Sequence, residues 1–272
     1  MVNEDKSPDG RALSKALHAE GKLIPFIGAG LSTRFNVPSW PQLVDIIAEE
    51  LGWDPEVFRL NGSFLQLAEY FVAEKGSIGP LRSRMDKLFY PKDADILASR
   101  AHMALVEMRS PLIYTTNFDD IIERAFRLKR VPCHVVAGIR DIADAKPEST
   151  LVVKFHGTFA DDESLVLTES SYFERLEFES ALDIRLRSDI LGKTLLFLGY
   201  SFSDINIRYM LYKLNKLRAK GNLPDQLPTA IITAFSPSQV ERRLLERLRV
   251  AIVELDPLKR DDSVDEFLEG LR

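Results

Sequence analysis

The chain has 272 residues, of which 45% are hydrophobic and 28% charged, values that are ordinary for a soluble globular protein with a sizeable core. No apolar run approaches the roughly 20 residues needed to cross a bilayer, so the sequence excludes a membrane-spanning helix. The formal net charge of −5 argues against broad binding to a nucleic-acid backbone, and the single cysteine, Cys133, excludes a disulfide within the chain and a four-cysteine zinc site.

Short apolar runs alternate with amphipathic stretches along the chain, a pattern typical of an α/β fold with a parallel sheet. Continuous runs of Ile, Leu, Val and Phe indicate strands that are buried on both faces. These runs are Leu23–Ile27, Pro111–Thr115, Leu151–Phe155, Thr194–Leu198, Thr229–Thr233 and Val250–Val253. A further short run, Cys133–Val136, is expected at an edge of the sheet. The sequence therefore predicts a Rossmann-like parallel sheet of about six strands with helices on both faces.

Helices are expected between these strands. The candidates are Pro41–Leu51, Phe118–Leu128, Tyr172–Ile190, Asp204–Leu217 and Ser238–Arg247. Ser238 and Glu241 form a capping-box pattern at the start of the last of them. No strand pattern occurs over residues 54–109, where the helical candidates are Phe64–Lys75, Pro80–Phe89 and Asp93–Met108. We therefore predict one domain over residues 1–272, with a helical insertion at 54–109 between the first and second strands.

A glycine-rich turn follows the first strand and consists of Gly28, Ala29, Gly30, Leu31 and Ser32. A strand that leads into Gly-x-Gly begins a dinucleotide site, because glycine permits a tight turn and lets backbone amides approach a pyrophosphate. The third glycine of the full motif is absent, and no clear ribose-binding acid follows at the usual distance. An ordinary strand-to-loop turn remains the alternative interpretation.

Polar residues also follow the second strand. Thr116, Asn117 and Asp119 are expected at the crevice, because ligands of open parallel sheets bind beyond the carboxyl ends of the strands. The amide of Asn117 can hold ribose hydroxyls or a water, and the carboxylate of Asp119 can accept hydrogen bonds from a carboxamide. The alternative is that one of these side chains caps the helix that begins near Asp120.

Two further strands end in the same kind of residue. His156 and Gly157 follow the run Leu151–Phe155, and Gly199 and Ser201 follow Thr194–Leu198. An unperturbed histidine titrates near neutral pH, so His156 is a candidate general base. A structural strand-end histidine and an ordinary turn with a helix cap are the alternatives for these two segments.

Taken together, these segments resemble the sirtuin family, over a region from about Leu23 to about Val253. The resemblance implies a site that binds NAD and breaks the bond between nicotinamide and ribose. It assigns Asn117 and His156 as catalytic residues and Gly28, Ala29, Gly30, Ser32, Thr116, Asp119, Gly199 and Ser201 as residues that bind the cofactor. Gly28, Ala29, Gly30 and Ser32 are expected at the phosphates, Asp119 at the nicotinamide carboxamide, and Gly199 and Ser201 at the adenosine side.

The chain departs from deacylating sirtuins, because a single cysteine cannot form their structural zinc site. In addition, their Thr-Gln-Asn is Thr115, Thr116 and Asn117 here, and the residues between Gly30 and Trp40 differ from the usual pattern. It is more similar to the prokaryotic sirtuin-like effectors of antiphage defence, which hydrolyse NAD. The expected activity is therefore that of a metal-independent NAD glycohydrolase that releases nicotinamide and ADP-ribose. The alternatives are an NAD-dependent protein deacylase or ADP-ribosyltransferase, a non-catalytic module that binds NAD or ADP-ribose, and an ordinary dehydrogenase.

The setting of such an enzyme is also an expectation. The polar segment Met1 to Gly10 lacks the apolar region of a secretory signal, so we expect a cytoplasmic protein without membrane contact. An effector that destroys NAD has to be controlled, which favours a homo-oligomer. The length leaves no room for an added sensor domain, so a separate sensor or translocase-type ATPase is the expected partner by analogy. Candidate interfaces are the helical insertion and the segment Asp265–Arg272, with core-packing or solvated surface as the alternative.

Overall fold

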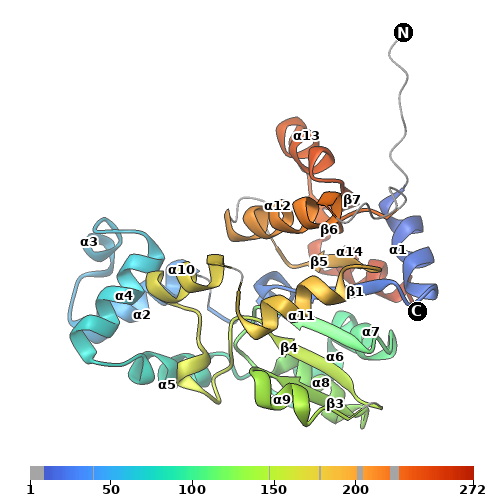
Figure 1. Cartoon of the computed structure of the whole chain (residues 1–272). Helices are drawn as coiled ribbons and strands as arrows, with labels where there is room; N and C mark the ends of the chain where they lie inside the picture. The colour runs from blue at the N-terminus through green and yellow to red at the C-terminus, as the bar shows by residue number, and fades with distance from the viewer. Residues whose placement is uncertain (1–8, 39, 147, 178, 201–204, 221–226) are drawn as a thin grey trace.

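Seven parallel strands form the central sheet of the computed structural model, which describes residues 9–38, 40–146, 148–177, 179–200, 205–220 and 227–272 (Figure 1). The strands are β1 (Leu23–Ile27), β2 (Leu112–Thr115), β3 (Cys133–Val136), β4 (Thr150–Lys154), β5 (Thr194–Leu198), β6 (Ala230–Phe235) and β7 (Val250–Leu255). Their order is β3-β4-β2-β1-β5-β6-β7, and every neighbouring pair is parallel. The predicted Rossmann-like α/β fold is confirmed. The count is seven strands rather than about six, because Cys133–Val136 joins the sheet at the edge where it was expected.

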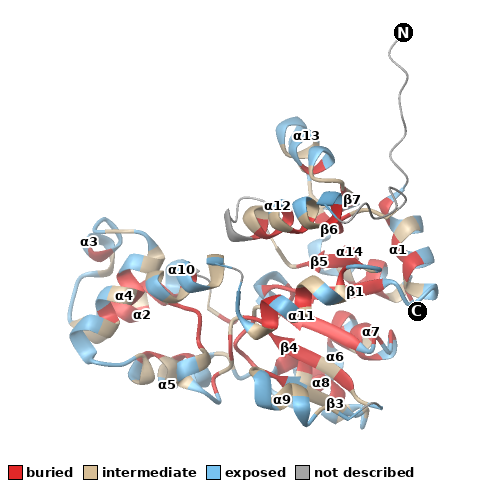
Figure 2. Cartoon of the chain, in the orientation of Figure 1, coloured by how far each residue is buried: buried red, intermediate tan, exposed pale blue. Residues whose placement is uncertain are grey.

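Alternate residues of each strand face two different hydrophobic cores, as the period of a pleated strand requires. In β1, Leu23 and Ile27 belong to one core, whereas Ile24 and Phe26 belong to the other. The first core is covered by α1 (Gly10–Ala19), α6 (Asp93–Ala98), α7 (Arg100–Glu107), α8 (Ile121–Leu128) and α14 (Arg260–Glu269). The second is covered by α9 (Ile139–Ala143), α11 (Ala181–Asp189), α12 (Ile205–Lys220) and α13 (Gln239–Arg247). The expected helices on both faces are therefore present, and burial is concentrated in the sheet between them (Figure 2).

The helices between β1 and β2 fall into two groups. One group is α2 (Trp40–Leu51), α3 (Pro55–Arg59), α4 (Phe64–Lys75) and α5 (Gly79–Leu88). These helices share a third core, beside the sheet in Figure 1, with Phe118 and Phe159 from the loops that follow β2 and β4. The second group, α6 and α7, packs on the sheet with α8. The third core therefore contacts the sheet at the loops that follow its strands.

The prediction of one helix over Tyr172–Ile190 is wrong. The structure has α10 (Glu169–Glu177) and then α11, which begins after Ser180. Ser180 has an extended backbone with ψ of 164°, and it forms a capping box with Asp183. A capping hydroxyl that bonds a backbone amide of the next helix competes with a continuous helix, so the chain breaks there. By contrast, the capping box predicted for Ser238 and Glu241 is confirmed.

The C-terminal segment Asp265–Arg272 belongs largely to α14, a helix that the strand and helix patterns did not predict. Phe267, Leu268 and Leu271 from this segment lie in the first core. The core-packing alternative is therefore the one that the structure supports here. Among the described residues, no helix is long and apolar enough to cross a membrane.

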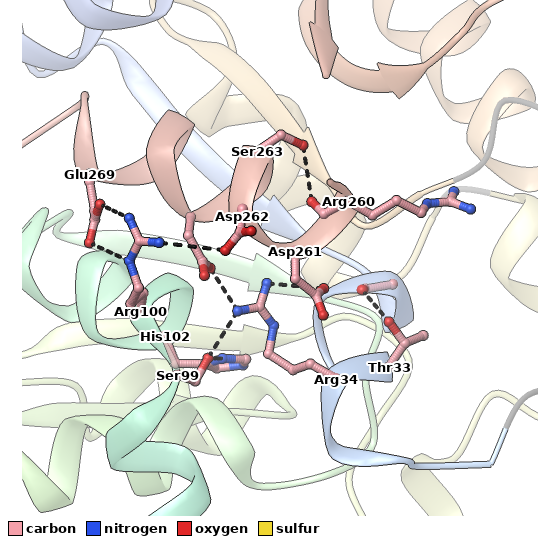
Figure 3. A network of polar contacts seen from close by, with 12 residues as sticks. Thr33, Arg34, Ser99, Arg100, His102, Arg260, Asp261, Asp262, Ser263 and Glu269 are labelled. Atoms are coloured by element: carbon pink, nitrogen blue, oxygen red, sulfur yellow. Dashed lines mark hydrogen bonds and ion pairs between the residues drawn. The ribbon is translucent and has the colours of Figure 1, made fainter. Parts of the chain in front are cut away.

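An ion-pair network joins the loop after β1 to α14 (Figure 3). Arg34 Nη1 lies 2.7 Å from Asp265 Oδ1, and the two side chains are only 10% and 7% exposed. The same guanidinium lies 3.5 Å from Asp261, which is 64% exposed. Ser99 Oγ accepts a long hydrogen bond of 3.4 Å from Arg34 and bonds His102 Nδ1 at 2.8 Å. The loop that follows the first strand is thus fastened to the last helix through a buried charge.

Replacing Asp265 with Asn removes the charge partner of a largely buried guanidinium. Breaking a buried ion pair from one side is costly, so we expect Asp265→Asn to lower the free energy of unfolding by about 3 kcal/mol. Asp261→Asn removes an exposed partner of the same guanidinium and is expected to cost about 0.5 kcal/mol. Urea denaturation measures both, and equal losses would show that Asp265 does not hold Arg34.

Candidate functional site

A cavity of about 620 Å³ lies where the carboxyl ends of β1, β2, β4 and β5 meet. From these strand ends it is lined by Ala29, Ser32, Thr116, Asn117, Asp119, His156 and Gly199. The structure therefore brings together residues from all the strand-end motifs of the sequence. Gly28 and Gly30 are not among the residues that line it, and Ser201 lies outside the described residues.

The two glycines of the first turn pack against the turn that follows β5. The amide of Gly28 donates to the carbonyl of Leu198 at 2.8 Å, and the amide of Gly30 donates to the carbonyl of Gly199 at 2.9 Å. A Cβ on Gly30 would lie 2.8 Å from Gly199 Cα, and one on Gly28 would lie 2.7 Å from the ring of Tyr200. These amides are engaged inside the protein, so the glycines set the shape of the turn while Ala29 and Ser32 line the cavity.

Asn117 is 6% exposed and is held from several sides. Its backbone amide donates to Thr115 Oγ1 at 3.0 Å, and its Nδ2 donates to Ser32 Oγ at 3.2 Å and to the carbonyl of Gly28 at 3.4 Å. Its Oδ1 is buried without a hydrogen-bond partner in the described structure. Buried polar atoms are rarely left unpaired, so this oxygen is suited to accept a hydrogen bond from a ribose hydroxyl or a water.

Asp119 is 4% exposed, and its Oδ1 accepts a hydrogen bond of 3.1 Å from the amide of Ile121 at the start of α8. Asp119 therefore satisfies the first amide of α8, whereas Asp120, at the N-cap position itself, makes no side-chain capping bond. Burial raises the pKa of Asp119 to about 6, against the opposing effect of the Lys154 ammonium. Lys154 is itself buried, donates to the Asp119 carbonyl and lies 3.1 Å from Glu123. At neutral pH, Asp119 is therefore mainly ionised, and its carboxylate can accept hydrogen bonds from the NH₂ group of a carboxamide.

His156 lines the cavity with its ring against aromatic neighbours. The ring centroid lies 6.0 Å from that of Phe155 and 5.4 Å from that of Tyr172, which meets it edge-on. Burial lowers the pKa of His156 to about 3, and the positive charge of Arg175 acts in the same direction. The imidazole is therefore neutral at physiological pH, but it is a much weaker base than the near-neutral histidine that the sequence led us to expect.

Tyr200 is a residue of the site that the sequence did not single out. Its hydroxyl donates to the carbonyl of Ile27 at 2.9 Å and lies 2.8 Å from Thr116 Oγ1. It thereby ties the ends of β1, β2 and β5 together. Its position between Gly199 and Ser201 in the turn was a usable signal.

An apolar wall completes the cavity. It consists of Val37, Pro38, Leu43, Phe64, Leu65, Phe89 and Phe118. Val37, Pro38 and Leu43 follow the glycine turn closely in the chain, whereas Phe64, Leu65 and Phe89 come from α4 and from the end of α5, far from any strand-end motif. No group of three or more His, Cys, Asp or Glu side chains that could hold a metal occurs among the described residues.

Comparison with known proteins identifies the family. A family model described as a SIR2-like domain matches residues 111–253, which is more than half of the chain. The chain belongs to the SIR2-like family. The match confirms the sirtuin resemblance, and it contains Asn117, Asp119, His156 and Gly199. The glycine turn after β1 precedes the matched region of this SIR2-like chain.

Several curated relatives of this SIR2-like chain are longer than it is. It is 30% identical to the NAD(+) hydrolase ThsA of Enterococcus faecium, over 98% of this chain and 58% of the relative. It is 31% identical to the NAD(+) hydrolase ThsA of Cytobacillus dafuensis, over 75% of this chain and 40% of the relative. It is 28% identical to the Defense-associated sirtuin 2 of Bacillus subtilis, over 83% of this chain and 22% of the relative. The chain thus spans 58% or less of the length of these relatives.

Gly199 provides a test of the turn packing. Its φ is +75°, and a Cβ there would lie 2.6 Å from Leu31 N. Gly52 has a matching φ of +74°, and a Cβ there would meet nothing within 4 Å. Alanine at Gly52 therefore measures only the cost of placing a side chain on a left-handed backbone. We expect Gly52→Ala to cost about 1 kcal/mol and Gly199→Ala about 3 kcal/mol. Chemical denaturation checks this, and equal costs would mean that the close approach of the turns contributes nothing.

Asp119 provides a pH-dependent test. Its folded pKa of about 6 lies above the ordinary value of 3.8, so the folded state binds more protons between these values. Protonated Asp119 therefore stabilises the folded state at low pH, and this contribution is lost as the pH rises through this window. Compared with the wild type, Asp119→Asn should become more stable by roughly 2–3 kcal/mol between pH 3.5 and pH 8. A pH-independent difference in unfolding free energy would contradict the raised pKa.

Proposed function

We propose that this SIR2-like chain hydrolyses NAD to nicotinamide and ADP-ribose. The observation that carries the proposal is the convergence of Asn117, Asp119 and His156 on one cavity beside a Gly-x-Gly turn. These residues offer an unpaired amide oxygen, a carboxyl group with a pKa near 6 and a neutral imidazole. Two of the relatives above carry the name NAD(+) hydrolase, which supports the same activity.

The proposed binding mode follows the order of the strand ends. The pyrophosphate lies along Ala29 and Ser32, in the turn that Gly28 and Gly30 shape. The nicotinamide ribose lies at Asn117, with Thr116 beside it. The carboxamide lies at Asp119, and Gly199 faces the adenosine side, to which the sequence also assigns Ser201.

Bond cleavage releases nicotinamide and leaves oxocarbenium character at the ribose C1′. A water that donates one hydrogen bond to Asn117 Oδ1 and another to His156 is placed to attack this carbon. Attack forms the new C–O bond, and one proton of the water passes to His156 and then to solvent. The balanced reaction is NAD⁺ and water to nicotinamide, ADP-ribose and a proton.

The low proton affinity of His156 is compatible with this role. A water that has added to an oxocarbenium ion is an oxonium, which is a strong acid. Its proton therefore moves readily even to a base with a pKa of about 3. A weak base in its neutral form is sufficient, provided that it is correctly placed.

The biological role that we propose is that of an antiviral defence effector that depletes NAD. One relative is named Defense-associated sirtuin 2, which supports this role. We further propose that the protein acts in the cytoplasm as a homo-oligomer, with a separate sensor or translocase-type ATPase as its partner. The need to restrain an enzyme that destroys a central cofactor motivates both the oligomer and the partner.

The direct test is release of nicotinamide from NAD by the purified chain, followed by chromatography. We expect Asn117→Ala and His156→Ala each to lower kcat by about 100-fold or more, because each removes a group that places or deprotonates the water. His18→Ala, in α1 and outside the cavity, is the matched histidine control and should retain activity.

This assay, together with measurements of ADP-ribose transfer and of NAD binding, separates the alternatives. Nicotinamide release that requires an acylated peptide would favour a deacylase, and transfer of ADP-ribose to protein would favour a transferase. Saturable NAD binding without turnover, also in the presence of candidate partners, would favour a binding module. Full activity of both cavity variants would overturn the assignment of the site.

A further inference from the structure

Helix α10 contacts the candidate base from behind. Tyr172 and Arg175 are three residues apart, so they project from one face of this helix. Tyr172 meets the His156 ring edge-on at 5.4 Å. Arg175 donates through Nη2 to the carbonyl of Phe155, the residue immediately before His156. One helix therefore contacts both the ring of His156 and the backbone that carries it.

The guanidinium of Arg175 is fixed by three further contacts. Its Cζ lies 4.2 Å from the centroid of the Phe155 ring, in a cation–π arrangement. Its Nη1 donates to Ser180 Oγ at 2.5 Å and lies 3.4 Å from Asp183 Oδ2. Asp183 is fully buried, and Ser180 caps α11. The break between α10 and α11 thus places a rigid anchor for Arg175 beside the end of β4.

Keeping this charge inside the protein is costly. The Arg175 side chain is 14% exposed, and burial lowers its pKa despite the nearby Asp183 carboxylate. A buried ion pair is weak evidence for stability, because an apolar side chain of similar volume often serves the fold as well. The contacts of Arg175 are therefore better explained by what they hold in place.

We propose that Arg175 is a positioning residue for His156, which fixes the strand-end turn through the Phe155 carbonyl so that the imidazole faces the cavity. The proposal rests on the proposed NAD hydrolysis, in which His156 accepts a proton. It assigns a functional role to a residue that does not line the main cavity. Arg175 acts on the reaction only through His156.

Several charged or titratable groups lie around His156, and Arg175 is the one whose replacement tests the proposal. Asp119, from the loop after β2, shares the cavity, and Lys154 lies two residues earlier on β4. Tyr172 comes from α10, and Glu163 and Glu174 lie with Arg175 around a smaller cavity behind the turn. Arg175 is the charged group that lowers the pKa of His156, after burial.

The experiment follows the His156 ring by NMR titration of the full chain without NAD, together with kcat and KM for NAD. In the wild type, the ring should stay neutral over the pH range in which the chain is folded. In Arg175→Met, loss of the positive charge and looser packing of the turn should shift the His156 ring signals and raise the midpoint. At the same time kcat should fall by about tenfold or more, because small misplacements of a reacting group are costly. KM should change much less.

Two variants control the interpretation. Arg175→Lys keeps the charge and one donor, so it should keep a low His156 midpoint and recover part of kcat. Arg185→Met removes a similarly buried arginine from α11, paired with Asp189 at 3.4 Å, and should leave both readouts at the wild-type values. If Arg175→Met does not fold cooperatively, Arg175→Gln tests loss of the charge with a donor retained, and it should also raise the midpoint.

The outcomes separate this proposal from the proposed function. An unchanged His156 midpoint and ring environment in Arg175→Met, or in Arg175→Gln if Met does not fold, would overturn the positioning role. Equal effects of Arg185→Met would also overturn it, because the effect would then be general. If the wild type releases no nicotinamide, NAD hydrolysis fails as the function, while the titration still decides whether Arg175 orders His156.

Discussion

The close backbone contact between the turns after β1 and β5 is the constraint on which the site depends. The amides of Gly28 and Gly30 bond carbonyls of the β5 end, and no Cβ fits at either position or at Gly199. Because β1 lies between β2 and β5, this contact fixes neighbouring strand ends relative to one another. Asn117 is then held by the first turn, through hydrogen bonds to Gly28 and Ser32. The placement of the amide in the cavity is thus a consequence of backbone packing.

The sequence predicts the part of the site that parallel-sheet geometry dictates. The run Leu23–Ile27 forms β1 with the predicted bounds, and the carboxyl ends of β1, β2, β4 and β5 meet at one cavity as expected. What it does not predict depends on contacts between distant segments. Phe64 and Tyr172 line the cavity because the third core and α10 approach the strand ends, and no local pattern records that approach. The break at Ser180, by contrast, could have been predicted from the sequence. Ser180 and Asp183 have the spacing of a capping box, but the continuous amphipathic pattern around them favoured one long helix.

The site concentrates features that reduce stability. Asp119 and His156 have pKa values displaced toward their neutral forms by burial, and Arg175 is largely buried with its charge. Each displacement costs free energy of folding at some pH, because the unfolded chain carries no such penalty. Local rules are commonly broken at functional sites and offset elsewhere. Here the offset is the well-paired sheet with two large cores, neither of which requires these groups.

The third core links the helices after β1 to the chemistry by direct contact. Phe118 lies between Asn117 and Asp119 in the chain, and Phe159 follows His156 by three residues. Both rings are buried in the core that α2, α4 and α5 form, and their centroids lie 5.8 Å apart. Packed cores do not deform gradually, so these helices cannot shift without moving the two loops that carry the site residues. They also supply the apolar wall of the cavity. Access to the cavity and placement of its reactive groups are therefore set by the same packing.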